Sequence, residues 1–236
     1  MYCIAIDLGG TIIKIGLVKG DEILEFSSFP AIAGSLDSNL PAMGGVINRL
    51  LSKWKVPREE LAGMGLAFPG MVNPKEKRVT STNDKYDDAC DIDLPSWVDR
   101  NWGTSFIIDN DARLALAGEW YMGAGKNSRN MVMMTIGTGI GTGVVLDGRI
   151  IKGTHYQAGS LGGHIVVDYR GRRCTCGNIG CVEAMASSFF LPEIIRTHPK
   201  ISSEYKAKAS SYDFKTLFDL MRRGEPEATL LCKDCM

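Results

Sequence analysis

The sequence predicts an α/β protein built from two lobes. Apolar and β-branched runs separated by glycine turns alternate with segments of helical periodicity. A length of 236 residues suits one large core or two modest ones. A glycine-rich strand–turn–strand pattern also occurs twice, at the N-terminus and again after residue 130. We therefore expect two similar lobes that meet near Ala112, an N-terminal lobe of residues 1–112 and a C-terminal lobe of residues 113–236.

The first half begins with a predicted three-stranded meander. It comprises CIAIDLGG, TIIKIGLVKG and DEILEFSSF, which are apolar runs broken by Gly-Gly and Gly-Asp turns. Within residues 35–56, seven apolar residues recur at helical spacing after Ser and Asp, which are plausible helix caps. The stretch LAGMGLAFPG then predicts a strand that ends in a Pro-Gly turn. Residues 73–93 are polar and aperiodic, so we expect a loop or irregular strand over a site.

The second half repeats the strand-and-turn pattern. TSFIIDNDARLALAGEWYMG predicts a strand that runs directly into a helix, with two acids and an amide at the junction. NMVMMTIGTGIGTGVVLDGRI predicts a second hairpin whose bend is rich in glycine, as in the first hairpin. These elements complete the expected two-lobed α/β arrangement.

Composition indicates a folded protein without an affinity for nucleic acid. Hydrophobic residues make up 44% and charged residues 23% of the chain, which is ordinary for globular proteins. Lys plus Arg and Asp plus Glu both total 27. No run of like charge exceeds a few residues, so the basic surface that nucleic acids require is not expected.

The sequence also predicts a cytoplasmic location. The N-terminus shows no signal-peptide pattern, and no apolar stretch approaches membrane-spanning length. In that reducing compartment, the seven cysteines argue against a disulfide framework. Metal binding, catalysis or simple packing are the remaining roles for them.

Two glycine turns are candidate phosphate cradles. DLGGT and TIGTGIGTG place glycines and hydroxyls at strand bends, where backbone N–H groups can approach an anion closely. Taken singly, each turn is more simply a tight hairpin bend. The dinucleotide fingerprint fails at Thr142, where a third glycine would be needed, and GAGKNS lacks the first glycine of a P-loop.

The strand–helix junction offers a candidate base. Asp109, Asn110 and Asp111 follow one another where the chain turns into a helix. A carboxylate there can cap the helix, and it can equally accept a proton from a substrate hydroxyl. Position alone leaves both interpretations open.

One histidine and three cysteines have metal-ligand spacing. His164 is followed after nine residues by Cys174, after one more by Cys176 and after four more by Cys181. Four nitrogen and sulfur ligands, with glycines that permit a tight loop, fit a closed tetrahedral zinc site of the structural kind. The spacing therefore predicts a metal clamp rather than a disulfide knot.

Taken together, the motifs strongly resemble the ROK family of bacterial sugar kinases and repressors. They occur in order over residues 2 to about 190: AIDLGGT, FPGMV, STND, IDNDARLA, TIGTGIGTG and the H-x9-CxCGxxGCxE element, which is a signature of that family. The resemblance implies an actin-like and hexokinase-like ATPase fold of two ribonuclease-H-like lobes around a central cleft. It also implies ATP and Mg²⁺ as cosubstrates and a structural Zn²⁺.

The resemblance further implies roles for individual residues. It makes Asp111 the general base for a sugar hydroxyl. Around the sugar it places Asn83, Asn110, Asp111, His164 and Glu183. To zinc it assigns His164, Cys174, Cys176 and Cys181. Between the two glycine turns it places the phosphates of ATP, with Asp7 near the magnesium ion and with Gly9, Gly10, Thr11, Thr135, Gly137, Thr138 and Gly139 as the other contacts.

Two departures from the family pattern bear on function. Leu161 stands three residues before His164, where the family usually has a sugar-binding glutamate. The chain also reaches Met236 before the further glycine-rich segment and helices that the kinases have, so we expect a C-terminally shortened member. Sugar recognition and ATP affinity are the properties that these departures affect.

The leading expectation is an ATP-dependent kinase of a hexose or related sugar that acts on small molecules, and the resemblance suggests a homodimer. The alternative is a non-catalytic sugar-binding protein or degenerate kinase homologue. A DNA-binding repressor is not expected, because the first strand begins at the N-terminus without a preceding winged helix. No nucleic-acid or membrane partner is predicted.

Overall fold

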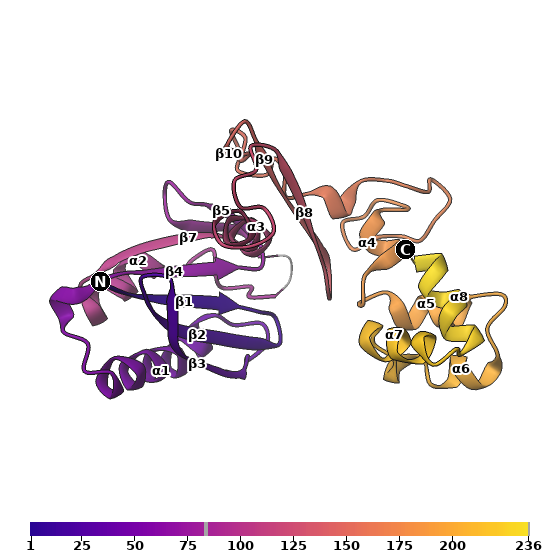
Figure 1. Cartoon of the computed structure of the whole chain (residues 1–236), viewed down its shortest axis with the longest axis horizontal. Helices are drawn as coiled ribbons and strands as arrows, with labels where there is room; N and C mark the ends of the chain where they lie inside the picture. Colours follow the sequence, from indigo (N-terminus) through magenta and orange to yellow (C-terminus); the bar gives the residue numbers. More distant parts are fainter. Residues whose placement is uncertain (83–84, 236) are drawn as a thin grey trace. The chain divides into compact units, whose positions relative to one another are not determined.

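The computed structural model describes residues 1–82 and 85–235, and the chain divides into two compact units (Figure 1). Unit 1 consists of Met1–Ser128 together with Lys152–Ala158, and unit 2 consists of Arg129–Ile151 and Gly159–Met236. Each unit contains its own sheet and its own core. Among the described residues, no helix combines the length and the apolar character needed to cross a membrane.

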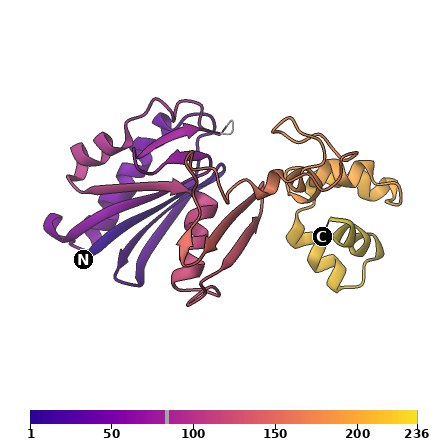
Figure 2. The same cartoon turned by 90° about the horizontal axis from the view of Figure 1, so that it is seen from above.

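Unit 1 is built on a five-stranded sheet of order β3-β2-β1-β4-β7 (Figure 2). Its strands are β1 (Tyr2–Leu8), β2 (Ile12–Lys19), β3 (Glu22–Pro30), β4 (Leu61–Phe68) and β7 (Ser105–Asn110). The first three strands are antiparallel neighbours, which confirms the predicted meander. β4 and β7 add in parallel, so their carboxyl ends meet at the edge of the sheet where β1 also ends.

Three helices pack on this sheet: α1 (Leu40–Lys53), α2 (Leu94–Trp102) and α3 (Asp111–Tyr121). α1 buries Leu40, Met43, Ile47 and Leu50, whose spacing of three or four residues puts them on one helix face. α2 ends at Gly103, which adopts a left-handed φ of 59°. Within the stretch expected to be irregular, β5 (Met71–Asn73) and β6 (Arg78–Ser81) form a short hairpin.

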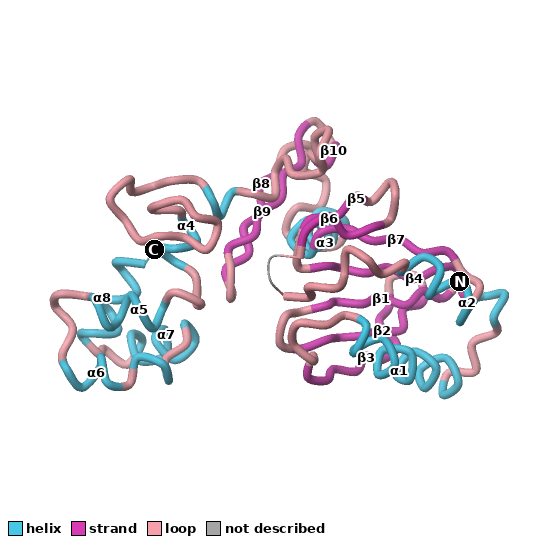
Figure 3. Tube along the Cα trace, turned by 180° about the vertical axis from the view of Figure 1, so that it is seen from behind, coloured by secondary structure: helices cyan, strands magenta, loops and turns pink. Residues whose placement is uncertain are grey.

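Unit 2 contains the predicted second hairpin and a group of helices (Figure 3). Its strands are β8 (Met131–Ile136), β9 (Ile140–Leu146) and β10 (Arg149–Ile150), and its helices are α4 (Val182–Ala186), α5 (Leu191–Thr197), α6 (Ser203–Ala207), α7 (Phe214–Arg222) and α8 (Pro226–Cys235). Cys174 and Cys181 lie in the same buried cluster as Leu191 and Ile195. Two cysteines of this loop therefore belong to the core of the unit, whereas Cys176 is exposed.

The boundary between the units lies later than the predicted lobe boundary. α3 contacts β4 and β7, so the first unit runs on to Ser128 instead of ending near Ala112. Residues 152–158 then return to unit 1 after the hairpin of unit 2. The division into lobes of residues 1–112 and 113–236 itself stays a prediction.

Candidate functional site

The first glycine turn joins β1 to β2 and is held in one shape. The Gly9 N–H donates to the Ile12 carbonyl at 3.1 Å, and an added Cβ on Gly9 would lie 2.5 Å from that oxygen, so only glycine fits. The buried Tyr86 hydroxyl donates to the Gly9 carbonyl at 2.6 Å. Gly10 and Thr11 are exposed at the tip. The turn is thus a fixed hairpin bend whose tip is open to a ligand.

Asp7 stands just before this turn. Its carboxylate is half-exposed and pairs with Lys14 on the neighbouring strand at 3.1 Å. An exposed ion pair of this kind contributes little stability, so little would be lost if a bound cation took the place of Lys14. The position therefore fits the predicted approach of a magnesium ion.

Asn110, and not an acid, caps helix α3. Its side-chain oxygen accepts from the Arg113 N–H at 3.2 Å. Its amide nitrogen donates to the Gly70 carbonyl at 3.1 Å and to Asp111 Oδ1 at 3.0 Å. The sequence left open whether an acid caps this helix. The cap is the Asn110 side chain, and the Asp111 carboxylate does not serve as the cap.

Asp111 is a partly buried carboxylate with an altered proton affinity. Its Oδ1 accepts from the Ala112 N–H at 2.7 Å. Burial raises the pKa of Asp111 above its ordinary value, the charge of Asp7 also raises it, and the Ala112 N–H and Lys85 oppose this shift. A raised pKa makes the carboxylate a stronger base, which is the property that proton abstraction from a hydroxyl requires.

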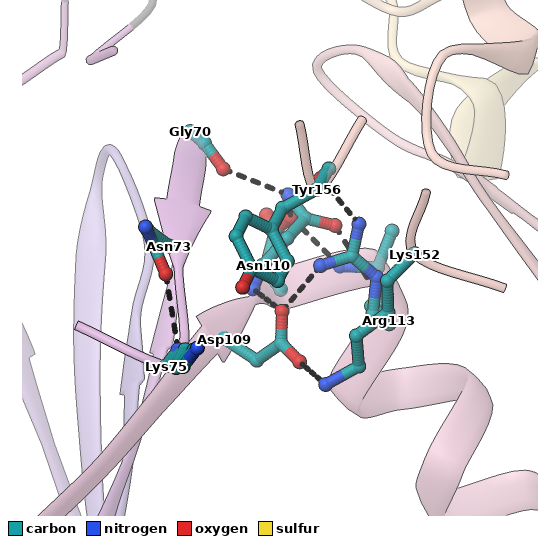
Figure 4. A network of polar contacts seen from close by, with 10 residues as sticks. Gly70, Asn73, Lys75, Asp109, Asn110, Arg113, Lys152 and Tyr156 are labelled. Carbon is teal, nitrogen blue, oxygen red and sulfur yellow. Dashed lines mark hydrogen bonds and ion pairs between the residues drawn. The ribbon is translucent and has the colours of Figure 1, made fainter. Parts of the chain in front are cut away.

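A buried polar network lies beside the junction (Figure 4). Arg113 is 2% exposed and pairs with Asp109. Lys152 donates to the other Asp109 oxygen at 2.7 Å, and Arg113 Nη2 donates to the Tyr156 carbonyl at 2.7 Å. The Asn110 N–H also donates to Asp109 Oδ1, at 2.8 Å. The network therefore ties the returning segment 152–158 to the strand end that carries Asn110.

Sequence reasoning missed three members of this network, Arg113, Lys152 and Tyr156. Asp109 and Arg113 are four residues apart, a spacing that could have signalled the ion pair. Lys152 and Tyr156 carry no comparable signal, because their contacts depend on the return of residues 152–158 to unit 1.

The second glycine turn joins β8 to β9 and is bound to α4 and to the residues that follow this helix. The Gly137 carbonyl accepts from the Ser188 N–H at 2.9 Å, and the Thr138 carbonyl accepts from the Phe189 N–H at 3.2 Å. The Ile140 N–H donates to Glu183 Oε2 at 2.8 Å. Glu183 thus contacts the predicted phosphate turn, and its role beside the sugar stays a prediction.

Replacing Gly139 with alanine is expected to displace the Glu183 carboxylate, because an added Cβ would lie 2.6 Å from Glu183 Oε2. The buried Ile140 N–H would then lose its acceptor, which costs about 1–3 kcal/mol. Denaturant unfolding of the variant measures this loss. Gly137→Ala is the matched control, since its added Cβ meets nothing within 4 Å. Equal destabilisation of both variants would contradict the role of Glu183.

The predicted metal ligands converge in unit 2. The ligand atoms of His164, Cys174, Cys176 and Cys181 all lie within 4.8 Å of one another, and this is the one such group in the described part of the chain. Cys174 Sγ lies 3.6 Å from His164 Nδ1, and Cys176 Sγ lies 3.7 Å from Cys181 Sγ. Tetrahedral zinc would separate these atom pairs by about 3.6 Å and about 3.8 Å.

These distances separate a metal site from a disulfide. A disulfide would bring two sulfur atoms to about 2.05 Å, and these cysteines are free. Gly177 and Gly180 adopt left-handed φ values of 91° and 71°, which allow the loop to fold back on itself. Burial and the neighbouring thiols raise the pKa of Cys181 to about 12, so a cation is needed to stabilise its thiolate. The donor set fits a structural zinc ion.

The predicted site residues fall into two groups, one in each unit. Unit 1 holds Asp7, Gly9, Gly10, Thr11, Asn110 and Asp111. Unit 2 holds Thr135, Gly137, Thr138, Gly139, His164, Cys174, Cys176, Cys181 and Glu183. Asn83 lies outside the described residues. Within unit 2, the Thr135 hydroxyl donates to the Gly141 carbonyl at 3.3 Å, and Leu161 is 42% exposed.

Comparisons with known proteins bear on the family and the fold. A model of the ROK family matches residues 3–235. A glucokinase from Thermotoga maritima is 28% identical over 97% of this chain and 72% of its own length. A xylose repressor from Bacillus subtilis is 31% identical over 70% of this chain and 43% of its own length. This chain thus spans less than half of the repressor that it matches.

Solved structures include a similar ROK hexokinase from Thermus thermophilus. The likeness has a TM-score of 0.75 at 27% identity, and it covers 100% of this chain and 73% of that one. The predicted α/β fold of the actin-like and hexokinase-like class is thereby confirmed.

Proposed function

The chain belongs to the ROK family, and from that premise we propose that it transfers the terminal phosphoryl group of ATP to a hydroxyl of a hexose or related sugar. The observation that carries the proposal is the Asp111 carboxylate, which burial makes more basic and which follows the carboxyl end of the parallel strand β7. The glucokinase and hexokinase names of relatives support the reaction class.

In the proposed reaction, Asp111 takes the proton of the attacking hydroxyl as that oxygen bonds to phosphorus. Asn110 holds the carboxylate in place, because its side-chain amide donates a hydrogen bond to Asp111 Oδ1. General base catalysis of this kind contributes roughly 10²- to 10⁴-fold, and the remainder comes from positioning and charge neutralisation. When bound, Mg²⁺ supplies charge neutralisation at the phosphates, and the carboxylate of Asp7 is the group we assign to approach it.

Zinc has an orienting role in this proposal. His164, Cys174, Cys176 and Cys181 would hold it, and the chemistry it supplies is structural because all four positions are filled by the protein. The clamp fixes the loop on which His164 and Glu183 are mounted. His164 and Glu183 are the groups of unit 2 that we assign to the sugar.

The pH dependence of the reaction is expected to reflect the raised pKa of Asp111. Activity requires the ionised carboxylate, so kcat/KM should fall as the pH drops through a pKa above the ordinary 3.8. The contribution of Asp111 to folding stability should change with pH in the opposite direction. A raised folded-state pKa favours the protonated form, so stability is greatest below the unfolded-state pKa and is lost as the pH rises through the folded-state pKa. Initial rates and unfolding measured across the acidic range check both signs, and an acid limb at the ordinary carboxyl pKa would contradict the prediction.

The second candidate is a sugar-binding protein without kinase activity. Leu161 favours it, because an apolar side chain replaces the carboxylate that the family resemblance expects near the sugar hydroxyls. The xylose repressors among the relatives also point to a regulatory role.

Sugar-dependent release of ADP from ATP separates the two functions. A panel of hexoses and 2-acetamido hexoses should include at least one sugar that accelerates ADP release in the presence of Mg²⁺. A sugar that raises the melting temperature but releases no ADP would support the sugar-binding function and overturn the kinase.

A further inference from the structure

Unit 1 contains a pocket that the proposed reaction does not use. Its volume is about 510 Å³, which is within the range of small-molecule sites, roughly 300–1,000 Å³. Met71 and Asn73 of β5 and Thr80 of β6 form one wall, and residues 154–157 form the other. None of these residues belongs to the candidate base, the glycine turns or the metal clamp.

The second wall is held in place by contacts with the buried ion pair of Asp109 and Arg113. Lys152 at the start of the returning segment bonds to Asp109, and the Tyr156 carbonyl accepts from Arg113. Asp109 and Arg113 are 7% and 2% exposed, so their ion pair is shielded from water, whereas the Lys152 side chain is 37% exposed. Breaking a buried, paired charge is costly, which keeps the segment in place against the hairpin.

Tyr156 is also held in an uncommon backbone conformation. Its φ is +57°, which places a bulky non-glycine residue in the left-handed region. Such strain persists only where surrounding contacts impose it, and it gathers at ligand clamps and active sites. Here the Tyr156 carbonyl accepts from Arg113 at 2.7 Å, and the Tyr156 N–H donates to the Gly153 carbonyl at 3.4 Å. The strained backbone and the buried ion pair both indicate that surrounding contacts hold this wall in one fixed conformation.

The lining has the chemistry of a neutral, hydroxyl-rich ligand. Threonine hydroxyls, the side-chain amide nitrogen of Asn73 and the His155 ring can exchange hydrogen bonds with hydroxyl groups, and Tyr156 and Met71 supply apolar surface. No carboxylate, lysine or arginine is among the lining residues. A phosphate or other anion would therefore find no counter-charge in the wall.

The pocket adjoins the residues around the candidate base. Met71 directly follows Gly70, whose carbonyl accepts from the Asn110 amide (Figure 4). Arg113 links the opposite wall to the same helix start. We propose that this pocket binds the second ring of a glycoside or disaccharide whose first ring reaches Asp111. The inference rests on the proposed function and narrows its substrate class.

Filling the pocket tests the proposal. Thr80→Trp, at an exposed position of β6, is expected to raise the Kd for cellobiose or maltose at least tenfold relative to that for glucose. His155→Ala, on the other wall, should raise the same ratio severalfold. Glu22→Trp, an exposed strand position outside the pocket, is the matched control and should leave the ratio unchanged. Binding is measured by calorimetry without ATP, so that it does not depend on turnover.

The outcomes separate the two proposals. Disaccharides that bind more weakly than glucose to the wild-type protein, or variants that weaken both ligands equally, would overturn the pocket assignment. ADP release with glucose alone would then leave the kinase proposal standing. Disaccharide binding that Thr80→Trp abolishes, without ADP release from any sugar, would uphold the pocket and overturn the kinase.

Discussion

Replacing Asp111 with asparagine is expected to lower kcat by roughly 10²- to 10⁴-fold while sugar affinity changes only a few fold. Asparagine keeps the oxygen that accepts from the Ala112 N–H and from Asn110, so the geometry of the helix start survives. It cannot take a proton at useful pH. The variant should therefore separate turnover from binding, which coupled ADP-release assays and calorimetry measure on the same preparation.

The same substitution is expected to increase stability near neutral pH. Burial raises the pKa of Asp111, so the ionised side chain opposes folding there, and a neutral amide removes that opposition. Asp91→Asn, at an exposed loop position, is the matched control and should change neither turnover nor stability. Equal loss of binding, turnover and stability in Asp111→Asn would identify Asp111 as a structural residue and not as a base.

Removing one ligand of the metal clamp is expected to unfold much of unit 2. Structural zinc contributes on the order of 10 kcal/mol to small domains, comparable with the roughly 5–15 kcal/mol net stability of a folded protein. Cys176 is the suitable target because it is exposed, whereas Cys174 and Cys181 belong to the core. Cys176→Ser should abolish stoichiometric zinc and lower the melting temperature, as should a chelator.

The loss should extend to the second glycine turn. Glu183 lies between the clamp and the Ile140 N–H, with Oε1 3.5 Å from Thr175 Oγ1 and Oε2 2.8 Å from the Ile140 nitrogen. Backbone hydrogen exchange at Gly137 to Ile140 should therefore accelerate in Cys176→Ser, while β1 and β2 of unit 1 keep their protection. Cys90→Ser, an exposed cysteine of unit 1, is the control. A protein that contains no zinc as purified, or that keeps its stability after verified loss of zinc, would refute the clamp.

Local pattern was sufficient to predict the strands of the two glycine-turn hairpins, β4, β7 and the helices α1 and α3, whereas α2 and α4 to α8 were not predicted. Alternation in β1 places Ile4, Ile6 and Leu8 on one buried face, and apolar runs bounded by glycine turns identify β2 and the hairpin of unit 2. The ligand spacing around Cys174 likewise predicted a cluster, because a short loop with glycine turns keeps its four ligands close together. Such features are encoded within a few residues of one another.

Features that depend on distant parts of the chain could not be predicted. The hairpin of β5 and β6 is too short for periodicity to reveal it. Glu183 was assigned to the sugar by resemblance, and only the fold shows that its carboxylate reaches the β8–β9 turn 43 residues earlier. The assignment of the helix cap to Asn110 depends on backbone geometry that the three adjacent polar residues do not reveal.

The return of residues 152–158 to unit 1 has a consequence for dividing this protein into fragments. The hairpin of unit 2 is inserted between α3 and a segment that completes the first unit, so no single cut yields two autonomous pieces. A polypeptide of residues 1–128 would keep the Asp109–Arg113 pair but would lose the Lys152 amine and the Tyr156 carbonyl that satisfy it. Unit 1 is therefore a discontinuous domain, and residues 129–151 of unit 2 are an insertion within its sequence.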